Sequence, residues 1–512
     1  MSRLRPLVPL ASTLALAVAG GVAAWLAPGT ARTANPVVPT LPPVGDFAWD
    51  VRDADTGVPI PCKLTFVGVD GTPSPAFTKN DIGRQEIGAV AAHDRLMAAE
   101  GVGAARVPQG TYDVWVSRGP EWDLFTARRV KVGAQGTRVS AKLHHVVDTA
   151  GWISADFHVH ANMSTDSRVP MDDRIYEFLA DGVEVITSTD HNVVADYGPI
   201  IRELGAGMDI ASIVGDEMTT GGWGHFGAFP LPQDLERAGM GAVLVHGRSA
   251  ADFFKDVRVS APTAIIDVHH PRIDSEIGYF NLGRLDAAHD RAERPGFSFD
   301  FDALEVLNGY QDPERRSVDR VIDEWFTLLQ HGRLVTATGN SDTHHLDHNI
   351  GGYPRNYVRV LDDKPAAVTP DAIARAVRMH RSFFTTAPFV RMHIGGADIG
   401  EVADARAGKV KVEIEVQAAP WVSVSTVTLY QSGKEVKRWP VKPSTDVVRF
   451  REALDLPVGC DGFVVARVDG NEPLAPVVGD LKRFDVRPLA LTNPIFLDRD
   501  GNGAFDAPLR AK

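Results

Sequence analysis

The sequence predicts a mixed α/β protein, in which a parallel sheet closes into a barrel and a small β domain precedes and follows it along the chain. Three observations predict this fold class. Strand-like and helix-like runs alternate between residues 150 and 390, the hydrophobic period is two on both sides of that stretch, and polar residues gather where the predicted strands end. Repeated β-α units of this kind favour a site at the carboxyl-terminal rim of a barrel.

Size and composition narrow the class of protein. The chain has 512 residues, which is too many for one core when a domain usually holds roughly 150 residues. Its 44% hydrophobic and 23% charged residues disfavour disordered, collagen-like and polytopic membrane proteins. A net charge of −13 would repel a polyanion, so we expect no nucleic-acid partner. Cys62 and Cys460 are too few for a disulfide scaffold, and their pairing stays open.

Residues 1–34 are expected to be a signal peptide or signal anchor. Arg3 and Arg5 precede an apolar stretch from Leu7 to Ala27, and a loop-like segment follows, which is the order of an export signal. The apolar stretch approaches the length of a membrane span, so an uncleaved membrane anchor is the alternative. We therefore expect an extracytoplasmic protein, either periplasmic or secreted.

Two segments have the period-two pattern of β domains. Residues 45–148 contain short alternating runs separated by turn signals, among them Cys62, Leu64 and Phe66. The same period returns in residues 391–512, on Val410, Val412, Ile414 and Val416. Alternation of this kind indicates strands with one buried face, so a small β domain is predicted at each place.

The segment between them, residues 150–390, alternates strands with helices. The strand candidates are residues 183–189, 210–217, 263–270, 302–307 and 333–340. The clearest helix begins with Asp312 as its cap and Pro313 at its first position, and it ends at Gly332.

Histidines and carboxylates lie near the ends of the first predicted strands. His158 and His160 are two apart on a strand and so share a face. Asp166 follows in a loop, and the next two strands end in His191 and Glu217. Because each oxygen of a carboxylate can bind a different cation, Glu217 is a candidate bridge between two metals.

The later strands end in the same way. His225 follows eight residues after Glu217, and Asp342 and His344 again share one face. His269 and His270 should face opposite sides of their strand, so only one of them is expected to bind metal. Buried histidines and carboxylates are costly unless they are paired or bound to metal, so the series predicts a polynuclear metal site.

The order of these motifs resembles the PHP family, which is named for polymerase and histidinol phosphatase. The motifs in this sequence are, in chain order, His-x-His, an aspartate eight residues after the first histidine, Thr-Asp-His, Gly-x-Glu, Gly-His, His-Pro and Ser-Asp-x-His. Further motifs look like the carbaryl-hydrolase-like subgroup, the CehA/McbA-type metallohydrolases: GHFGAFPL, FDALEVLNG, GNSDTHH followed by GGYPRNYV, and TNPIFLDRDGNGAFD. Within residues 45–148, VPQGTYDVWVSRGPE resembles a carboxypeptidase-regulatory-like β-sandwich.

The resemblance implies a distorted (β/α)7 PHP barrel, flanked by β-sandwich-like domains, that holds two or three divalent metals. It assigns His158, His160, Glu217 and Asp342 to the first metal, Glu217, His225 and His270 to the second, and Asp166, His191 and His344 to the third. Zinc, manganese and iron all suit nitrogen and oxygen ligands of this kind. For the ligand that follows Glu217 along the chain, the resemblance leaves His246 as an alternative to His225.

These residues lead to a hypothesis of metal-dependent hydrolysis. A hydroxide bridging two metals would attack an ester, carbamate or amide of a small-molecule substrate, and a PHP phosphatase or phosphodiesterase would use the same residues. The candidate catalytic residues are Glu217, Asp342 and Arg355. Arg355 could clamp an anionic group of the substrate or form a surface salt bridge. Asp156 could orient a ligand or cap the backbone.

Glu305 and Asn308 are predicted to line the pocket.

Two rival interpretations of the function remain: an amidohydrolase barrel, which usually bridges its metals through a carboxylated lysine, and a non-catalytic exported protein that is stabilised by metal. Asp498, Asp500, Asn502 and Asp506 have the spacing of a calcium loop, but Leu509 stands where a bidentate glutamate should be. A plain Asp-Gly and Asn-Gly turn is therefore expected there, with a calcium site as the alternative.

Overall fold

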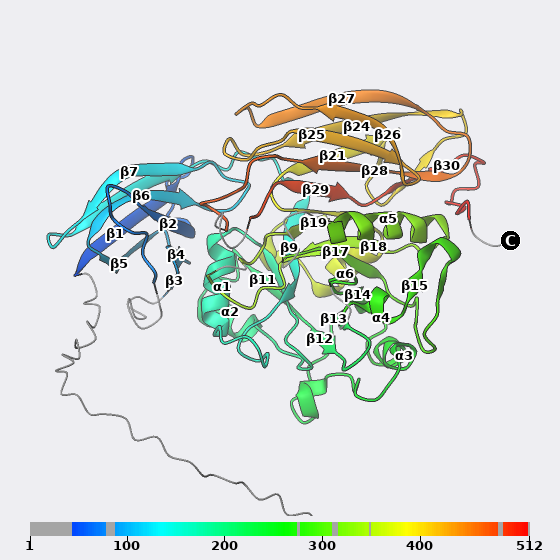
Figure 1. Cartoon of the computed structure of the whole chain (residues 1–512), viewed down its shortest axis with the longest axis horizontal. Coiled ribbons are helices and arrows are strands. Elements are labelled where there is room, and N and C mark those ends of the chain that lie inside the picture. The colour runs from blue at the N-terminus through cyan, green and yellow to red at the C-terminus, as the bar shows by residue number, and fades with distance from the viewer. Residues whose placement is uncertain are drawn as a thin grey trace, which may run out of the picture. The chain divides into compact units, whose positions relative to one another are not determined.

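The computed structural model describes residues 43–77, 88–273, 277–309, 316–347, 350–479 and 485–509. It is a mixed α/β protein with many strands and few helices (Figure 1). Pro43–Lys512 form one compact unit, separate from Met1–Pro42, so the predicted export signal lies outside the described residues. Among the described residues, no helix is both long and apolar enough to cross a membrane.

The amino-terminal strands form two sheets. The strand order in the first sheet is β5 (Val102–Pro108), β1 (Val44–Asp53), β8 (Thr137–Leu143). The strand order in the second sheet is β3 (Ala89–Ala92), β4 (Arg95–Ala98), β2 (Cys62–Gly68), β6 (Gly110–Ser117), β7 (Phe125–Val132). Phe47, Phe66 and Tyr112 are buried in the core that these sheets share, where Phe66 contacts both of the other rings edge to edge. The pairs are antiparallel, except that β1 and β8 run parallel.

Residues 152–385 contribute strands to two further large sheets and contain a two-stranded one, formed by β15 (Leu285–Asp286) and β16 (Arg291–Ala292). The first contains β11 (Ala211–Val214), β10 (Val185–Ser188), β9 (Trp152–Val159), β19 (Arg355–Arg359) and β20 (Ser382–Thr385). The second contains β12 (Asp216–Thr219), β13 (His225–Phe229), β14 (Ile265–Val268), β17 (Ala303–Asn308) and β18 (Thr336–Asn340). Single parallel bridges, Val159 to Thr343 and His191 to Glu217, join segments of the two sheets.

The expectation of a uniformly parallel sheet is wrong. β9–β10–β11 and β14–β17–β18 are parallel, but β12–β13, β13–β14, β9–β19 and β19–β20 are antiparallel. Between β12 and β13 lie only residues 220–224. A connection of this length forms a hairpin, whereas a parallel pair needs a crossover of a dozen or more residues.

Gly215 divides the strand that was predicted at residues 210–217 into β11 and β12. A Cβ atom built on Gly215 would lie 2.9 Å from the Ser188 carbonyl oxygen and 3.0 Å from the Ala228 carbonyl oxygen. Ser188 belongs to the first sheet and Ala228 to the second. The chain therefore passes from one sheet to the other at a residue that has no side chain.

The helices are short except for one. They are α1 (Met171–Ala180), α2 (Gly198–Glu203), α3 (Ala250–Ser260), α4 (Tyr279–Leu282), α5 (Arg316–Gln330) and α6 (Pro370–Arg378). α5 is the predicted helix, and it buries Val318, Val321, Ile322, Trp325 and Leu329. Its expected start at Asp312 and Pro313 lies outside the described residues. Gly332, just beyond its end, has a φ of 80°.

The carboxyl-terminal strands share a sheet with the central ones. A four-stranded sheet contains β22 (Ala397–Asp398), β21 (Phe389–Ile394), β24 (Lys409–Gln417) and β27 (Val448–Pro457). The first central sheet continues from β20 through β29 (Leu489–Thr492), β28 (Gly462–Asp469) and β25 (Thr426–Gln431) to β26 (Lys434–Pro440), with β30 (Ile495–Asp498) on β28 and β23 (Val402–Asp404) on β30. The boundary predicted at residue 390 thus falls inside β21.

Candidate metal centre

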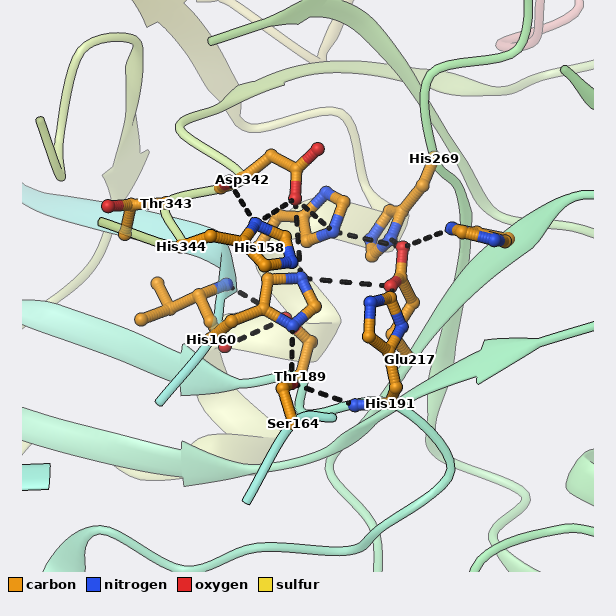
Figure 2. Close-up of polar contacts among 12 residues, drawn as sticks. His158, His160, Ser164, Thr189, His191, Glu217, His269, Asp342, Thr343 and His344 are labelled. Carbon is orange, nitrogen blue, oxygen red and sulfur yellow. Dashed lines mark hydrogen bonds and ion pairs between the residues drawn. The ribbon is translucent and has the colours of Figure 1, made fainter. Parts of the chain in front are cut away.

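The end of β9 places two histidines in the interior. His158 and His160 are both completely buried, with ring centroids 5.0 Å apart. His158 Nε2 lies 3.0 Å from Glu217 Oε1 and 3.1 Å from Asp342 Oδ1. His160 Nε2 lies 3.3 Å from the same Asp342 oxygen (Figure 2). Both imidazoles therefore point at two carboxylates, that of Glu217 on β12 and that of Asp342 just after β18.

Glu217, on β12, lies at the centre of the cluster and is completely buried. Its carboxylate oxygens are surrounded by imidazole nitrogens at 2.7 Å (His191 Nδ1), 2.8 Å (His269 Nδ1), 3.4 Å (His225 Nδ1), 3.6 Å (His270 Nε2) and 3.7 Å (His160 Nε2). One carboxylate is thus shared by histidines from several strands, as a bridging ligand would be.

Asp166, His191 and His344 form the outer edge. Asp166 Oδ2 lies 3.0 Å from His191 Nε2, and Asp166 Oδ1 lies 3.3 Å from His344 Nε2. The Asp166 side chain is 54% exposed, whereas the side chains of His158 and Glu217 are fully buried. The cluster therefore extends from a closed interior to an edge that solvent reaches.

Four overlapping groups of these residues could hold a metal ion, with all donor atoms of a group within 4.8 Å of one another. They are His160, His191, His344; His158, His160, Glu217; His158, His270, Asp342; and His191, Glu217, His225. Of the nine predicted ligands, Asp166 is outside these groups but contacts two members of one. The cluster is a candidate polynuclear metal centre.

Unsatisfied polar atoms show that the donor set fits a cation. Nε2 of His158, Nε2 of His160 and Oε2 of Glu217 are buried without a hydrogen-bond partner. Lone pairs that face one another in a buried site are costly unless a positive charge lies between them. Imidazole nitrogen with carboxylate oxygen is a ligand set that zinc, manganese and iron accept.

The neighbouring carboxylates favour protonated histidines in this cluster when no metal is present. Burial alone would lower the pKa of His158, but Asp342, Glu217 and Glu305 raise the pKa well above its usual value. Burial would also lower the pKa of His191, and Glu217 and Asp166 raise that pKa to about 10. Burial would raise the pKa of Glu217, but the surrounding histidines hold it well below its usual value. Metals must therefore displace protons on binding.

The alternation predicted for His269 and His270 is wrong. β14 ends at Val268, and His270 has a φ of 29°, in the left-handed region. Strand periodicity no longer applies after Val268, so both side chains reach Glu217. The His269 ring also stacks on the His158 ring, with centroids 3.6 Å apart. Only His270 of the pair belongs to a group that could hold a metal. The contact of His269 with Glu217 could not be predicted, because the end of a strand cannot be located to one residue.

Two aspartates near the cluster accept hydrogen bonds from backbone amides. Asp156 is buried and accepts hydrogen bonds from the amides of His158, Ser341 and Gly352, which is the capping role. Asp190 accepts from the amides of Ala161 and Ser164, so it shapes the loop after β9. His246, the alternative to His225, is exposed and belongs to none of the four groups.

The clamp role expected of Arg355 does not match its surroundings. Its side chain is completely buried, and its guanidinium donates to the carbonyl oxygens of Gly352, Asp181 and Gly182. These bonds hold a loop, and they use the groups that a substrate anion would need. The alternative, a surface salt bridge, is also wrong because the side chain is buried.

The segment with calcium-loop spacing forms hydrogen bonds within its own turn. Asp498 accepts from the amides of Gly501 and Gly503, and Asn502 donates to Asp506. Asp498 and Asp500 also lie near Asp461 in a group that could hold an ion.

Cys62 is buried and Cys460 is exposed, and both are free thiols.

Comparisons with known proteins add little. No family model matches the chain, and no curated protein does. One similar solved structure is a candidate metal-dependent phosphoesterase from Bifidobacterium adolescentis, 14% identical, with a TM-score of 0.27 over 38% of this chain and 90% of that chain. Another is an engineered protein, 13% identical, with a TM-score of 0.16 over 63% of this chain and 51% of that chain. Such low TM-scores support no conclusion about fold or function.

Proposed function

We propose that this chain is a metal-dependent hydrolase of the PHP type, close to the CehA/McbA subgroup, and that it cleaves esters, carbamates or amides of small molecules. The observation that carries the proposal is the position of Glu217, whose one carboxylate lies within 3.7 Å of nitrogens from histidines of several strands. A buried carboxylate surrounded by imidazole nitrogens is better suited to binding metal than to packing in a core.

Bound divalent cations would supply a nucleophile near neutral pH and polarise the oxygen of the substrate. The residues of the chain would hold these cations and fix their spacing. Glu217 would bridge two of them, and Asp342 would join His158 and His160 at the buried end. The proposed ligands are His158, His160, Glu217 and Asp342 for the first metal, Glu217, His225 and His270 for the second, and Asp166, His191 and His344 for the third.

Replacing the bridge tests the metal part of the proposal. Glu217→Gln should lose at least one bound metal equivalent and lower turnover by about 100-fold or more, since a neutral amide binds metal poorly. Elemental analysis and a hydrolysis assay measure the two effects. Glu184→Gln is the control, because Glu184 lies outside the cluster and accepts from Ser154. Unchanged metal content and turnover in Glu217→Gln would rule out the bridging role.

A substrate panel tests the choice of carbonyl chemistry, which rests on the family resemblance. The metal-loaded protein should hydrolyse aryl esters or aryl carbamates faster than nitrophenyl phosphates when all are assayed in parallel. Activity confined to phosphates would instead identify a phosphatase or phosphodiesterase. Bound metal with no hydrolysis of any substrate would favour a binding protein.

Export is proposed on the order of charged, apolar and loop-like segments in residues 1–34. Expression of the full chain followed by fractionation should place it outside the cytoplasm, either released or at the membrane. A wholly cytoplasmic chain of full length would contradict this part of the proposal.

A further inference from the structure

Glu305 lies beneath the metal cluster, on β17, and is completely buried. Its carboxylate receives four hydrogen bonds. Oε1 accepts from His158 Nδ1 at 3.0 Å and from Asn340 Nδ2 at 3.1 Å. Oε2 accepts from the His270 amide at 2.7 Å and from Asn308 Nδ2 at 2.9 Å. Among the described residues, Glu305 belongs to none of the groups that could hold a metal.

We infer that Glu305 is a positioning residue, which orients three metal ligands from three different segments without binding a metal itself. The inference rests on the proposed metal-dependent function. It begins at His158, whose Nδ1 faces Glu305 and whose Nε2 faces Glu217 and Asp342. A carboxylate at Nδ1 keeps the proton on that nitrogen, so the Nε2 lone pair is directed toward the cation.

Glu305 also orients the segment that follows β14. Its Oε2 accepts from the His270 amide at the residue with φ of 29°. A non-glycine residue rarely adopts this conformation, so the hydrogen bond offsets part of its cost. The turn is what allows the His270 side chain to reach Glu217, 3.6 Å away.

Asn308 extends the effect to a third ligand. The same amide nitrogen donates to Glu305 Oε2 and, at 3.0 Å, to Asp342 Oδ2. One oxygen of Asp342 is thereby held, while its Oδ1 faces His158 and His160.

The chemistry of the four partners requires a carboxylate. All four are donors: an imidazole N–H, two side-chain amides and a backbone amide. A glutamine in place of Glu305 would turn its own NH2 group toward two of them and leave buried donors unpaired. His158 could respond by moving its proton to Nε2, which would block the metal.

The test compares Co²⁺ binding by the wild-type full chain, Glu305→Gln and Glu305→Asp. Each protein is stripped of metal and dialysed against buffered Co²⁺, and the dissociation constants and the visible absorption spectrum are measured. Circular dichroism checks folding. Glu305→Gln should bind Co²⁺ roughly 10- to 100-fold more weakly at one position or more, with an altered spectrum. Glu305→Asp, which keeps the charge, should recover part of the loss.

Glu184→Gln is the matched control, since Glu184 accepts hydrogen bonds from the amide and hydroxyl of Ser154 outside the cluster. Wild-type affinity and spectrum in Glu305→Gln would overturn the inference, as would an equal loss in Glu184→Gln. If Glu305→Gln does not fold, wild-type affinity in Glu305→Asp overturns it. A wild-type chain that binds no Co²⁺ overturns both this inference and the proposed function. Binding without hydrolysis of any substrate overturns the function alone.

Discussion

Two buried histidines show how surroundings decide what an imidazole does. His158 lies among carboxylates that raise its pKa well above the usual value. His380 is also buried, but it packs against Phe496 and shares one hydrogen bond with the Thr336 hydroxyl. Burial lowers the pKa of His380 to about 4. The first histidine suits a cation site, and the second is a neutral core residue.

His380 makes the stability of the folded chain depend on pH. Because its folded pKa of about 4 lies below the usual histidine value of about 6.5, the unfolded chain takes up a proton first as pH falls. Stability is therefore lost between about pH 6.5 and 4, by roughly 2–3 kcal/mol. His380→Asn lacks this contribution, so the stability difference between wild type and variant should shift by that amount from pH 7.5 to 4.5.

Urea unfolding of both proteins in chelator, at the two pH values, measures the shift. His289→Asn, at an exposed histidine, is the control and should show a much smaller change. A His380→Asn difference that does not vary with pH would contradict the prediction.

At the scale of elements, the loop after β9 carries the most exposed of the proposed ligands. Asp190 holds the loop through the amides of Ala161 and Ser164. Asp166, further along, is 54% exposed and contacts His191 and His344. The buried ligands are held by several elements, whereas this aspartate belongs to a single exposed segment.

The outer metal should therefore leave first. Titration of the loaded protein with chelator is expected to remove one equivalent before the rest. Asp166→Asn should bind one equivalent fewer and keep the others, because the buried donors are unchanged. Elemental analysis after dialysis measures both. Asp446→Asn, in a loop where Asp446 bonds to Ser444, is the control, and loss of all metals at once would contradict the prediction.

The positions of elements were predicted better than their pairing. Alternation at Val410 to Val416 corresponds to β24, and the apolar face of Val318 to Leu329 corresponds to α5. Both patterns depend on burial along one segment, which local sequence records. The hairpin of β12 and β13 and the crossing at Gly215 depend on segments far away, so no local pattern indicates them.

At the scale of the whole molecule, the central and carboxyl-terminal parts share sheet and core. β20 pairs with β29, and Phe326 of α5 packs on Phe463 of β28 with ring centroids 6.0 Å apart. Asn493 links β18 to β20: its side chain bonds both the amide and the carbonyl of Ala337, and the carbonyl of Ser382. This gives the TNPIF motif a structural role.

Asn493→Ala should destabilise both parts together. It would leave three buried backbone groups without this partner, at a cost of roughly 1–3 kcal/mol each, so we expect a loss of at least about 2 kcal/mol. Thermal unfolding should show one transition at lower temperature. Asn471→Ala, at an exposed asparagine bonded to Ser425, is the control. A separate transition for the carboxyl-terminal strands, with the rest unchanged, would contradict the shared core.

The sequence by itself determined where chemistry-bearing side chains follow apolar strands, because strand periodicity and strand ends are local properties. The resemblance to the PHP family then assigned nine of these side chains as metal ligands. Only the tertiary structure decided that His269 bonds to Glu217, that Arg355 holds a loop and that Glu305 contacts the cluster. These roles depend on which strands pair and where each strand ends, and such choices are made by contacts between residues far apart in the chain.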